Sequence, residues 1–462
     1  MIADGLPEVT ADGFSSFLIE ATEGNDVARL SGNAETDDSF VGTPTVSRFT
    51  TPTVNVIVNG FDLVAATSSD RRDDARLTGS AATESFFANS ETARLVGEGF
   101  VLNATGFLSA TGVSGGGDDT AILRDSAGDD LFLSQPEISV VLFDQGGSVN
   151  ALNYSVVRSL SSAGSDEVRL VGSSGDDTLV ASSNLFARLT TETTEAVAVG
   201  FPLVRSNGRG GQDRAFLTGT DGDDFFYGTP TTSFLNGAGF QNTVSEFETV
   251  VAIDTLGRDT ALLSDSQGDD TFFASPTVAS LNGDGFARLA LGFDFVRATS
   301  SGGNDVATLR DSDGDDNFFA SPELAFLRND TFYNEARGFS SVRAVAVNGN
   351  DFARMVDSAG NDSLRAFQAS SALSGSGFSN TAAGFDRVII DASTGNDVVE
   401  LFDSQTDDTF FGSGPSASLE GDSYFILANN FDTFDVFGFN GGTNRFFVAE
   451  TDFQWNRLGD WI

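Results

Sequence analysis

A tandem repeat of 46 residues is the feature that most constrains what this chain can fold into. Glycines that open a Gly-x-Asp turn recur at spacings of 46 or 47 residues: Gly164, Gly211, Gly257, Gly303, Gly349 and Gly395. Weaker starts of the same kind are Gly24, Arg71, Gly117 and Gly441. A fixed period in this range predicts units that bury their apolar face against their neighbours. We therefore expect one stacked array and not the three domains that 462 residues would ordinarily suggest.

The apolar residues of each repeat fall into fixed columns. One leucine-rich column runs from Leu30 to Leu401, and a fourth, aromatic column includes Phe286, Phe378 and Tyr424. The most uniform columns are aromatic: Phe40, Phe86, Phe132, Phe226, Phe272, Phe318 and Phe410 in one, and Phe61, Phe107, Tyr154, Phe201, Phe247, Phe293, Phe339, Phe385 and Phe431 in another. We expect each ring to stack on the equivalent ring of the next repeat in the core.

The local pattern within a repeat is that of β-strands. Short alternating or β-branched runs such as 306–309 and 342–347 are separated by Asp/Gly/Asn/Ser clusters, without helical periodicity. The chain is therefore predicted to be all-β, a parallel β-solenoid (β-helix) of about ten 46-residue repeats, each with two coils of about 23 residues. A ten-bladed β-propeller is the alternative, because a four-stranded blade has a similar length. Regular Gly-x-Asp turns favour the solenoid.

Both ends of the chain hold part of a repeat. We expect an N-terminal half-repeat at 1–23, nine tandem repeats in one solenoid at 24–440, and a C-terminal half-repeat with an aromatic cap at 441–462. Thr443 and Gln454 stand where we expect the repeat's aspartates, and Trp455 and Trp461 supply the cap. The half-repeats could cap the array, close a ring, or mediate self-association by docking the tail of one copy on the head of the next.

The charge of the chain excludes several functions. Asp and Glu total 67 against 25 Lys and Arg, which gives a net charge of −42, and there is no Lys, His or Cys. Such a surface repels phosphate, so nucleic-acid binding is excluded. Histidine- or cysteine-based catalysis and zinc–thiolate sites are excluded as well. No apolar run reaches the ~18 residues of a membrane span, and Met1–Glu23 lacks the pattern of a secretory signal.

The aspartates gather in the turns. Each repeat opens with Gly-x-Asp, as in Gly303-Asn304-Asp305, and usually carries Gly-Asp-Asp eleven residues later, as in Gly314-Asp315-Asp316. Stacked carboxylates repel unless cations lie between them, and hard cations prefer oxygen ligands. The candidate metal ligands are Asp166, Asp177, Asp213, Asp224, Asp259, Asp270, Asp305, Asp316, Asp351, Asp362, Asp397 and Asp408. A third column holds Asp125, Asp265, Asp311, Asp357 and Asp403, with glycine in other repeats. In the alternative interpretation, aspartate only forms the turns.

The Gly-x-Asp turns resemble the calcium-binding nonapeptides of RTX β-rolls. That resemblance implies Ca²⁺ held between adjacent coils. The spacing here is eleven residues and not nine, and only about half of each repeat carries the motif. The whole repeat also resembles the large repeat-rich secreted surface proteins of marine bacteria, which implies an extracellular or cell-surface location.

The repeats offer no combination of acid, base and substrate clamp, so we predict that the protein is not an enzyme. We expect an extracellular structural or adhesive protein, stabilised by Ca²⁺, that self-associates into filaments or contacts a cell surface or polysaccharide. The alternative is a closed propeller that binds carbohydrate or protein.

Overall fold

The computed structural model describes residues 13–34, 36–68 and 72–462. Residues 1–12 of the predicted N-terminal half-repeat and the repeat start at Arg71 lie outside the described residues. The described chain contains 48 strands and no helix, and its predominantly parallel pairing confirms the β-solenoid. The propeller alternative is wrong. None of the described segments is a helix with the length and apolar character needed to cross a membrane.

The chain forms two compact units, here called unit 1 (Met1–Asp213 with Gly239–Glu246) and unit 2 (Arg214–Ala238 with Phe247–Ile462). The strands of unit 1 are β1 (Ser16–Glu20), β2 (Val27–Ser31), β3 (Ser39–Gly42), β4 (Val46–Thr50), β5 (Asn55–Asn59), β6 (Leu63–Thr67), β7 (Asp74–Thr78), β8 (Ser85–Ala88), β9 (Thr92–Gly97), β10 (Phe100–Thr105), β11 (Ser109–Val113), β12 (Thr120–Arg124), β13 (Leu131–Gln135), β14 (Ile138–Leu142), β15 (Ser148–Leu152), β16 (Val156–Leu160), β17 (Glu167–Val171), β18 (Thr178–Ser182), β19 (Phe186–Thr190), β20 (Glu195–Val199), β21 (Leu203–Asn207) and β25 (Phe240–Ser245).

The strands of unit 2 are β22 (Arg214–Thr218), β23 (Phe225–Gly228), β24 (Thr232–Gly237), β26 (Thr249–Ile253), β27 (Thr260–Ser264), β28 (Thr271–Ala274), β29 (Val278–Gly283), β30 (Phe286–Leu291), β31 (Phe295–Thr299), β32 (Val306–Arg310), β33 (Asn317–Ala320), β34 (Leu324–Arg328), β35 (Tyr333–Arg337), β36 (Ser341–Val345), β37 (Phe352–Val356), β38 (Ser363–Phe367), β39 (Ser370–Gly375), β40 (Phe378–Ala383), β41 (Arg387–Asp391), β42 (Val398–Phe402), β43 (Thr409–Gly414), β44 (Ser416–Gly421), β45 (Tyr424–Asn429), β46 (Thr433–Gly438), β47 (Arg445–Thr451) and β48 (Gln454–Gly459).

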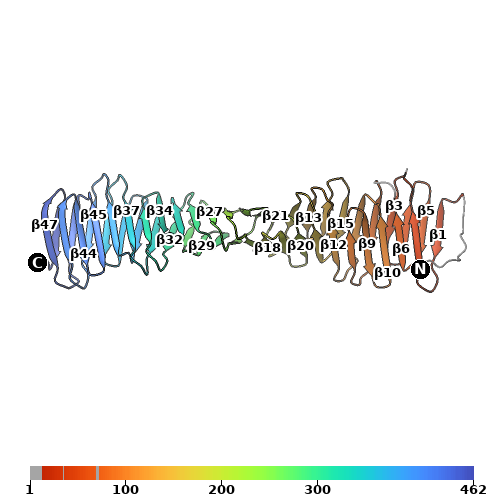
Figure 1. Ribbon diagram of the computed structural model, residues 1–462, viewed down its shortest axis with the longest axis horizontal. Helices are drawn as coiled ribbons and strands as arrows, with labels where there is room; N and C mark the ends of the chain where they lie inside the picture. Colours follow the sequence, from red (N-terminus) through yellow and green to blue (C-terminus); the bar gives the residue numbers. More distant parts are fainter. Residues whose placement is uncertain (1–12, 35, 69–71) are drawn as a thin grey trace. The chain divides into compact units, whose positions relative to one another are not determined.

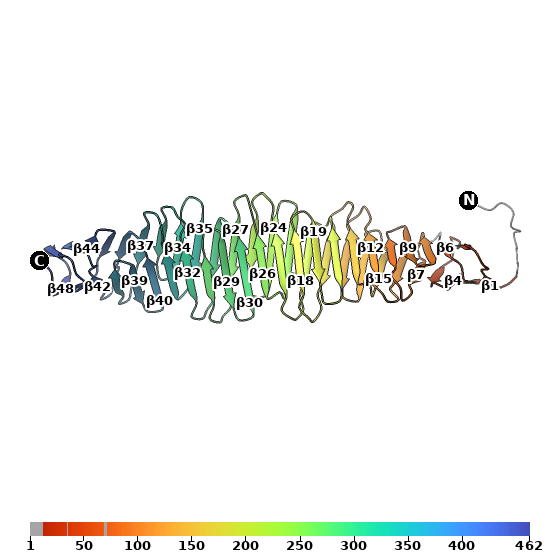
Figure 2. The same ribbon diagram turned by 90° about the horizontal axis from the view of Figure 1, so that it is seen from below.

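Within each unit the chain alternates between two facing sheets (Figures 1 and 2). In one repeat of unit 2, β27 lies in the first sheet, β28–β29–β30 form an antiparallel meander in the second, and β31 returns to pair in parallel with β27. The next repeat begins in the second sheet, where β32 pairs in parallel with β28, and its meander β33–β34–β35 lies in the first sheet.

A repeat therefore makes three passes between the sheets and not two coils of about 23 residues, so that part of the prediction is wrong. The physical reason is the meander, which keeps three consecutive strands in one sheet. An odd number of passes places equivalent strands of successive repeats in opposite sheets, as β28 and β33 are.

The predicted aromatic columns form the core. Phe272, Phe318 and Phe410 are fully buried or nearly so, because alternate residues of each strand point inward. The rings do not stack on their own column, however. Because successive repeats alternate between sheets, a ring of one column packs against a ring of the other column one repeat further along. These pairs are tilted, with centroids 5.7–6.4 Å apart: Phe40–Phe107, Phe86–Tyr154, Phe132–Phe201, Phe226–Phe293, Phe272–Phe339 and Phe318–Phe385.

The core of unit 2 also contains polar side chains at one repeating position. Asn334 and Asn380 each donate a hydrogen bond to a backbone carbonyl 59 residues earlier, Ser275 O and Ser321 O. Arg288 occupies the equivalent place and is fully buried. Its guanidinium donates to the carbonyl oxygens of residues 229, 230, 248 and 287 at 2.7–2.9 Å, and burial lowers its pKa to about 10. These bonds tie a meander to the preceding turn.

Adjacent phenylalanines on β33 give a test of this packing. Phe318 is 1% exposed, whereas Phe319 lies on the outer face and stacks on Phe326 with centroids 5.4 Å apart. Phe318→Ala should lower the free energy of unfolding by about 3–5 kcal/mol because it leaves a cavity. Phe319→Ala should cost only ~0.5–1.5 kcal/mol. Denaturant titration of both variants checks this, and equal losses would contradict the assignment of the core face.

Candidate metal sites

Buried aspartates come together in five groups of three, here called the Asp triads. In each triad, one carboxylate oxygen per residue lies within 4.8 Å of the others, and all the side chains are buried. The triads are Asp125–Asp130–Asp166 in unit 1, and Asp224–Asp254–Asp259, Asp265–Asp270–Asp305, Asp311–Asp316–Asp351 and Asp357–Asp362–Asp397 in unit 2.

The turns that position a triad follow directly from the repeat. In the second triad of unit 2, Asp265 follows β27, Asp270 precedes β28, and Asp305 precedes β32, one coil further on. Gly303 begins the turn before β32 at φ +109°, where a Cβ atom would lie 2.1 Å from the carbonyl oxygen of Gly268. Only glycine allows adjacent coils to approach this closely. The Gly-x-Asp motif therefore brings aspartates of consecutive coils together.

Each triad is partly held by hydrogen bonds to the backbone. Asp305 Oδ1 accepts the N–H of Asp270 at 2.7 Å, and Asp305 Oδ2 accepts the hydroxyl of Ser300. Asp270 Oδ2 accepts the N–H and the hydroxyl of Ser266. These are the turn-forming bonds of the alternative interpretation, so aspartate does form the turns. They account for only part of the carboxylate oxygens.

The remaining oxygens point to an additional ligand. The buried triad oxygens without a hydrogen-bond partner are Asp125 Oδ1, Asp224 Oδ1, Asp254 Oδ2, Asp265 Oδ2, Asp270 Oδ1, Asp316 Oδ1, both oxygens of Asp357, and Asp362 Oδ1. No triad carboxylate forms an ion pair with an arginine among the described residues. Buried, unpaired carboxylates are costly. A shared proton, a cation or an ordered water molecule is therefore needed to complete each triad.

Burial and neighbouring carboxylates change the acidity of the triads. Burial is the main cause that raises the pKa of Asp125 and Asp265 to about 6 and that of Asp254 to about 7. Burial and the nearby charges of Asp311 and Asp316 raise the pKa of Asp351 to about 6. Without a cation, the triads therefore retain protons in weakly acidic solution.

Asp254 is a triad member that the sequence columns did not reveal. It follows β26 at a place where other repeats have a serine such as Ser300, so no column of aspartates marks it. The sequence feature that could have revealed Asp254 is Gly219, which takes the third-column position in this repeat. A Cβ atom on Gly219 would lie 2.6 Å from Asp254 Oδ2 and 2.8 Å from Asp224 Oδ2. Both oxygens converge over this glycine, which makes room for Asp254.

Nine of the twelve predicted ligands lie in triads: Asp166, Asp224, Asp259, Asp270, Asp305, Asp316, Asp351, Asp362 and Asp397. Of the six other members, four come from the third column, which the sequence analysis identified but did not count among the ligands: Asp125, Asp265, Asp311 and Asp357. The remaining two are Asp254 and Asp130, and Asp130 belongs to the Gly-Asp-Asp turn of its repeat. Asp177 and Asp213 pair through the Asp177 N–H but have no third carboxylate, because Gly172 fills its place and a Cβ there would lie 2.2 Å from Asp177 Oδ2. Metal binding at these residues stays a prediction.

The last predicted ligand, Asp408, belongs to a group of a different kind, here called the closed node: Asp403, Asp408 and Asn444. The tail lacks the repeat's aspartate, as expected, but Asn444 and not Thr443 takes its place, and Asn444 Oδ1 accepts the Asp408 N–H at 3.1 Å. Asn444 Nδ2 also donates to Asp403 Oδ2 at 2.9 Å. Tyr424, which replaces the usual phenylalanine, donates its hydroxyl to Asp408 Oδ1 at 2.7 Å.

Every carboxylate oxygen of the closed node accepts a hydrogen bond. Asp408 Oδ2 accepts the Ser404 N–H, and Asp403 Oδ1 accepts the Phe439 N–H. In the triads, Asp270 Oδ1 lies beside the ring of Phe286, which has no hydroxyl to donate. The closed node thus shows that carboxylates held in the same backbone geometry can be satisfied by hydrogen bonds, without a cation.

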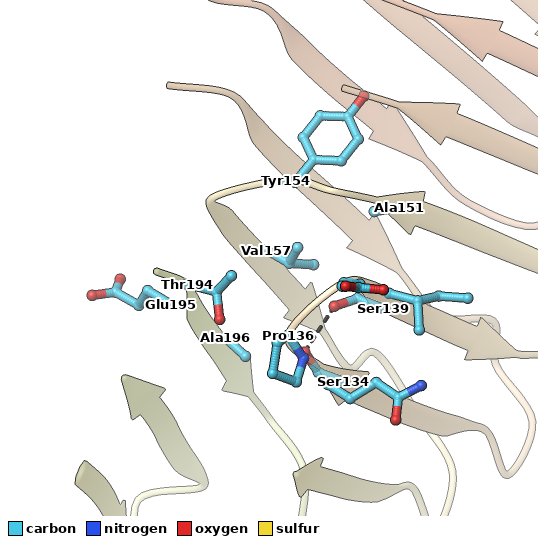
Figure 3. Close-up of a pocket in the computed structure, with 12 residues that line it drawn as sticks. Ser134, Pro136, Ser139, Ala151, Tyr154, Val157, Thr194, Glu195 and Ala196 are labelled. Atoms are coloured by element: carbon cyan, nitrogen blue, oxygen red, sulfur yellow. Dashed lines mark hydrogen bonds between the residues drawn. The ribbon is translucent and has the colours of Figure 1, made fainter. Parts of the chain in front are cut away.

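Unit 1 also contains a small cavity (Figure 3). It measures about 10 Å³, which is room for one water molecule. The hydroxyls of Ser134 and Ser139 lie 2.7 Å apart beside it, and Glu195 points away from them. It contains no triad residue and is too small for a substrate.

Comparison with known proteins gives no further guide. No family model matches this chain, and no curated protein is significantly similar to it. The resemblance to RTX repeats therefore rests on the Gly-x-Asp turns alone.

The raised pKa values predict how stability depends on pH. Triad aspartates such as Asp254 bind protons more tightly in the folded than in the unfolded chain, whose aspartates titrate near pH 3.9. Between about pH 4 and pH 7, the free energy of unfolding should therefore fall as pH rises. Protein stripped of divalent cations should melt at a higher temperature at pH 5 than at pH 8. The opposite order in differential scanning calorimetry would contradict this.

Proposed function

We propose that this protein is an extracellular structural or adhesive repeat protein whose solenoid is stabilised by Ca²⁺ at the Asp triads. The observation that carries the proposal is the set of buried triad oxygens without a hydrogen-bond partner. Three carboxylate oxygens within 4.8 Å of one another suit an ion that binds oxygen at 2.3–2.6 Å in flexible geometry. Mg²⁺ suits these sites less well because it keeps several waters and demands octahedral geometry.

The extracellular or cell-surface location rests on the sites and on the sequence resemblance. Calcium sites of extracellular modules are typically weak, with dissociation constants of about 10⁻⁴–10⁻³ M. In the triad Asp265–Asp270–Asp305, four of the six carboxylate oxygens already accept hydrogen bonds, so few remain for an ion. Weak affinity fits an environment where calcium is abundant.

The proposal includes a non-catalytic role with self-association or contact with surface polysaccharide. Strands β1 and β2 each pair along one edge only among the described residues, and Leu18 and Ile19 of β1 are exposed. Free strand edges with apolar side chains favour pairing with another chain. On β47, the C-terminal Trp461 and Ile462 occupy part of the edge and Trp461 packs on Phe446, which favours the predicted cap there.

Calcium dependence is the direct test of the proposal. Addition of millimolar Ca²⁺ to cation-free protein at pH 7.5 should raise the melting temperature by more than 10 °C, since ions that bind only the folded state stabilise it. Equal concentrations of Mg²⁺ should give a much smaller shift, and Na⁺ at matched ionic strength controls for screening of the net charge. An unchanged melting temperature would refute calcium stabilisation.

A further inference from the structure

The triads are unevenly distributed between the two units. Four of the five lie in unit 2, in the consecutive segment 224–397, and one lies in unit 1. The difference arises at the third-column position, which is glycine at Gly32, Gly79 and Gly172 of unit 1. In these repeats a Cβ at the glycine would lie within 2.5 Å of a neighbouring carboxylate oxygen. A third carboxylate at that position has no room beside the carboxylate already present.

One two-carboxylate site of unit 1, formed by Asp38 and Asp73, is satisfied by hydrogen bonds alone. Asp73 Oδ1 accepts the Asp38 N–H, and its Oδ2 accepts the Ser68 hydroxyl. Asp38 in turn accepts hydrogen bonds from Asn33 N–H and from the Thr36 hydroxyl. Neither carboxylate has an oxygen that is buried and without a partner.

Unit 2 carries the opposite arrangement over four repeats and then ends at the closed node. Each of its triads has at least one buried oxygen without a partner, and Asp357 has two. Beyond Asp397, Asn444 replaces the third carboxylate and Tyr424 supplies the missing donor. The triads therefore mark a bounded segment of unit 2 in which folding leaves carboxylate charge uncompensated.

We propose that divalent cations control the folding of unit 2 selectively: the part of unit 2 that holds its triads (224–238 and 247–397) requires one bound cation per triad, while the closed node and the Asp38–Asp73 site of unit 1 need none. Removal of the cations opens this segment first. In each of its four triads, three like charges then lie buried within 4.8 Å of one another. This deepens the proposed function by naming which part of the chain the cation regulates, and it rests on cation binding at the triads.

Hydrogen–deuterium exchange of the full chain at pH 7.5, with Ca²⁺ and after chelation, tests the proposal. We expect at least a tenfold loss of protection on chelation for peptides from β26 to β42, and less than a threefold change for those of β3 and β7, which follow Asp38 and Asp73. Uniform loss along the chain would overturn the selective control of unit 2 while leaving calcium stabilisation intact. No change anywhere would overturn both.

A paired set of substitutions tests the assignment of the sites. Calcium bound to the full chain, measured by mass spectrometry of the metal after gel filtration in Ca²⁺, should be five ions per chain, one for each triad. Asp357→Asn should lower the number of bound calcium ions by one. It should also protect β38 and β42 in the chelated protein, because it removes one of three like charges.

Asp315→Asn is the matched control. Asp315 is exposed and accepts the Asn350 N–H, and Asn361 accepts the equivalent bond from Asn396 in the next repeat.

The converse change should open the closed node. The double substitution Asn444→Asp with Tyr424→Phe restores three carboxylates and removes the hydroxyl donor to Asp408 Oδ1. It should add one bound calcium ion and make the protection of β43 and β47 dependent on Ca²⁺. A variant that stays protected after chelation and binds no additional ion would overturn the role assigned to Asn444 and Tyr424. Tyr424→Phe alone shows whether loss of the hydroxyl is sufficient to make the protection of β43 and β47 dependent on Ca²⁺.

Discussion

The hydrogen bond from the backbone N–H of one turn to an aspartate carboxylate of the next coil is the interaction on which this structure depends. It joins Asp270 to Asp305, Asp316 to Asp351, and Asp362 to Asp397, each across 35 residues at 2.7–2.8 Å. The bond satisfies a backbone donor that the close approach of adjacent coils removes from water. It also buries this carboxylate in the repeats from Asp73 to Asp397.

The buried carboxylates form three kinds of site, which differ in how their charge is limited or compensated. At Gly172 the third-column glycine limits the site to two carboxylates, because Gly208 stands at the position that Asp254 takes beside Gly219. Asn444 and Tyr424 replace a charge and supply a donor, so that the closed node is fully hydrogen-bonded. The Asp triads do neither, and they are the places where a proton, a cation or an ordered water molecule is needed to complete the site. One backbone geometry thus gives sites with different dependence on cations, and the choice lies in a few side chains.

The two-sheet course of the chain follows from the meander. Because three strands of each repeat remain in one sheet, equivalent strands of successive repeats lie in opposite sheets. Phe318 therefore packs against Phe385, which belongs to the other aromatic column one repeat further along. The same alternation leaves an interior position for polar side chains. There, Arg288 and Asn334 reach carbonyls about 60 residues earlier in the chain. These long-range bonds and the ring pairs hold neighbouring repeats in register.

The sequence by itself determined the repeat, the β-strands, the buried aromatic columns and the glycine–aspartate turns, because each follows from local spacing that recurs along the chain. It also identified nine triad residues, since Asp305 and its equivalents recur in a column. It did not determine the swap of sheets between repeats, the partner of each ring, the burial of Arg288, or the part played by Asp254 and Asn444. Those depend on which distant residues meet when coils stack. Asp254 reaches Asp224 only because Gly219 leaves space for it, and only the tertiary structure could show that.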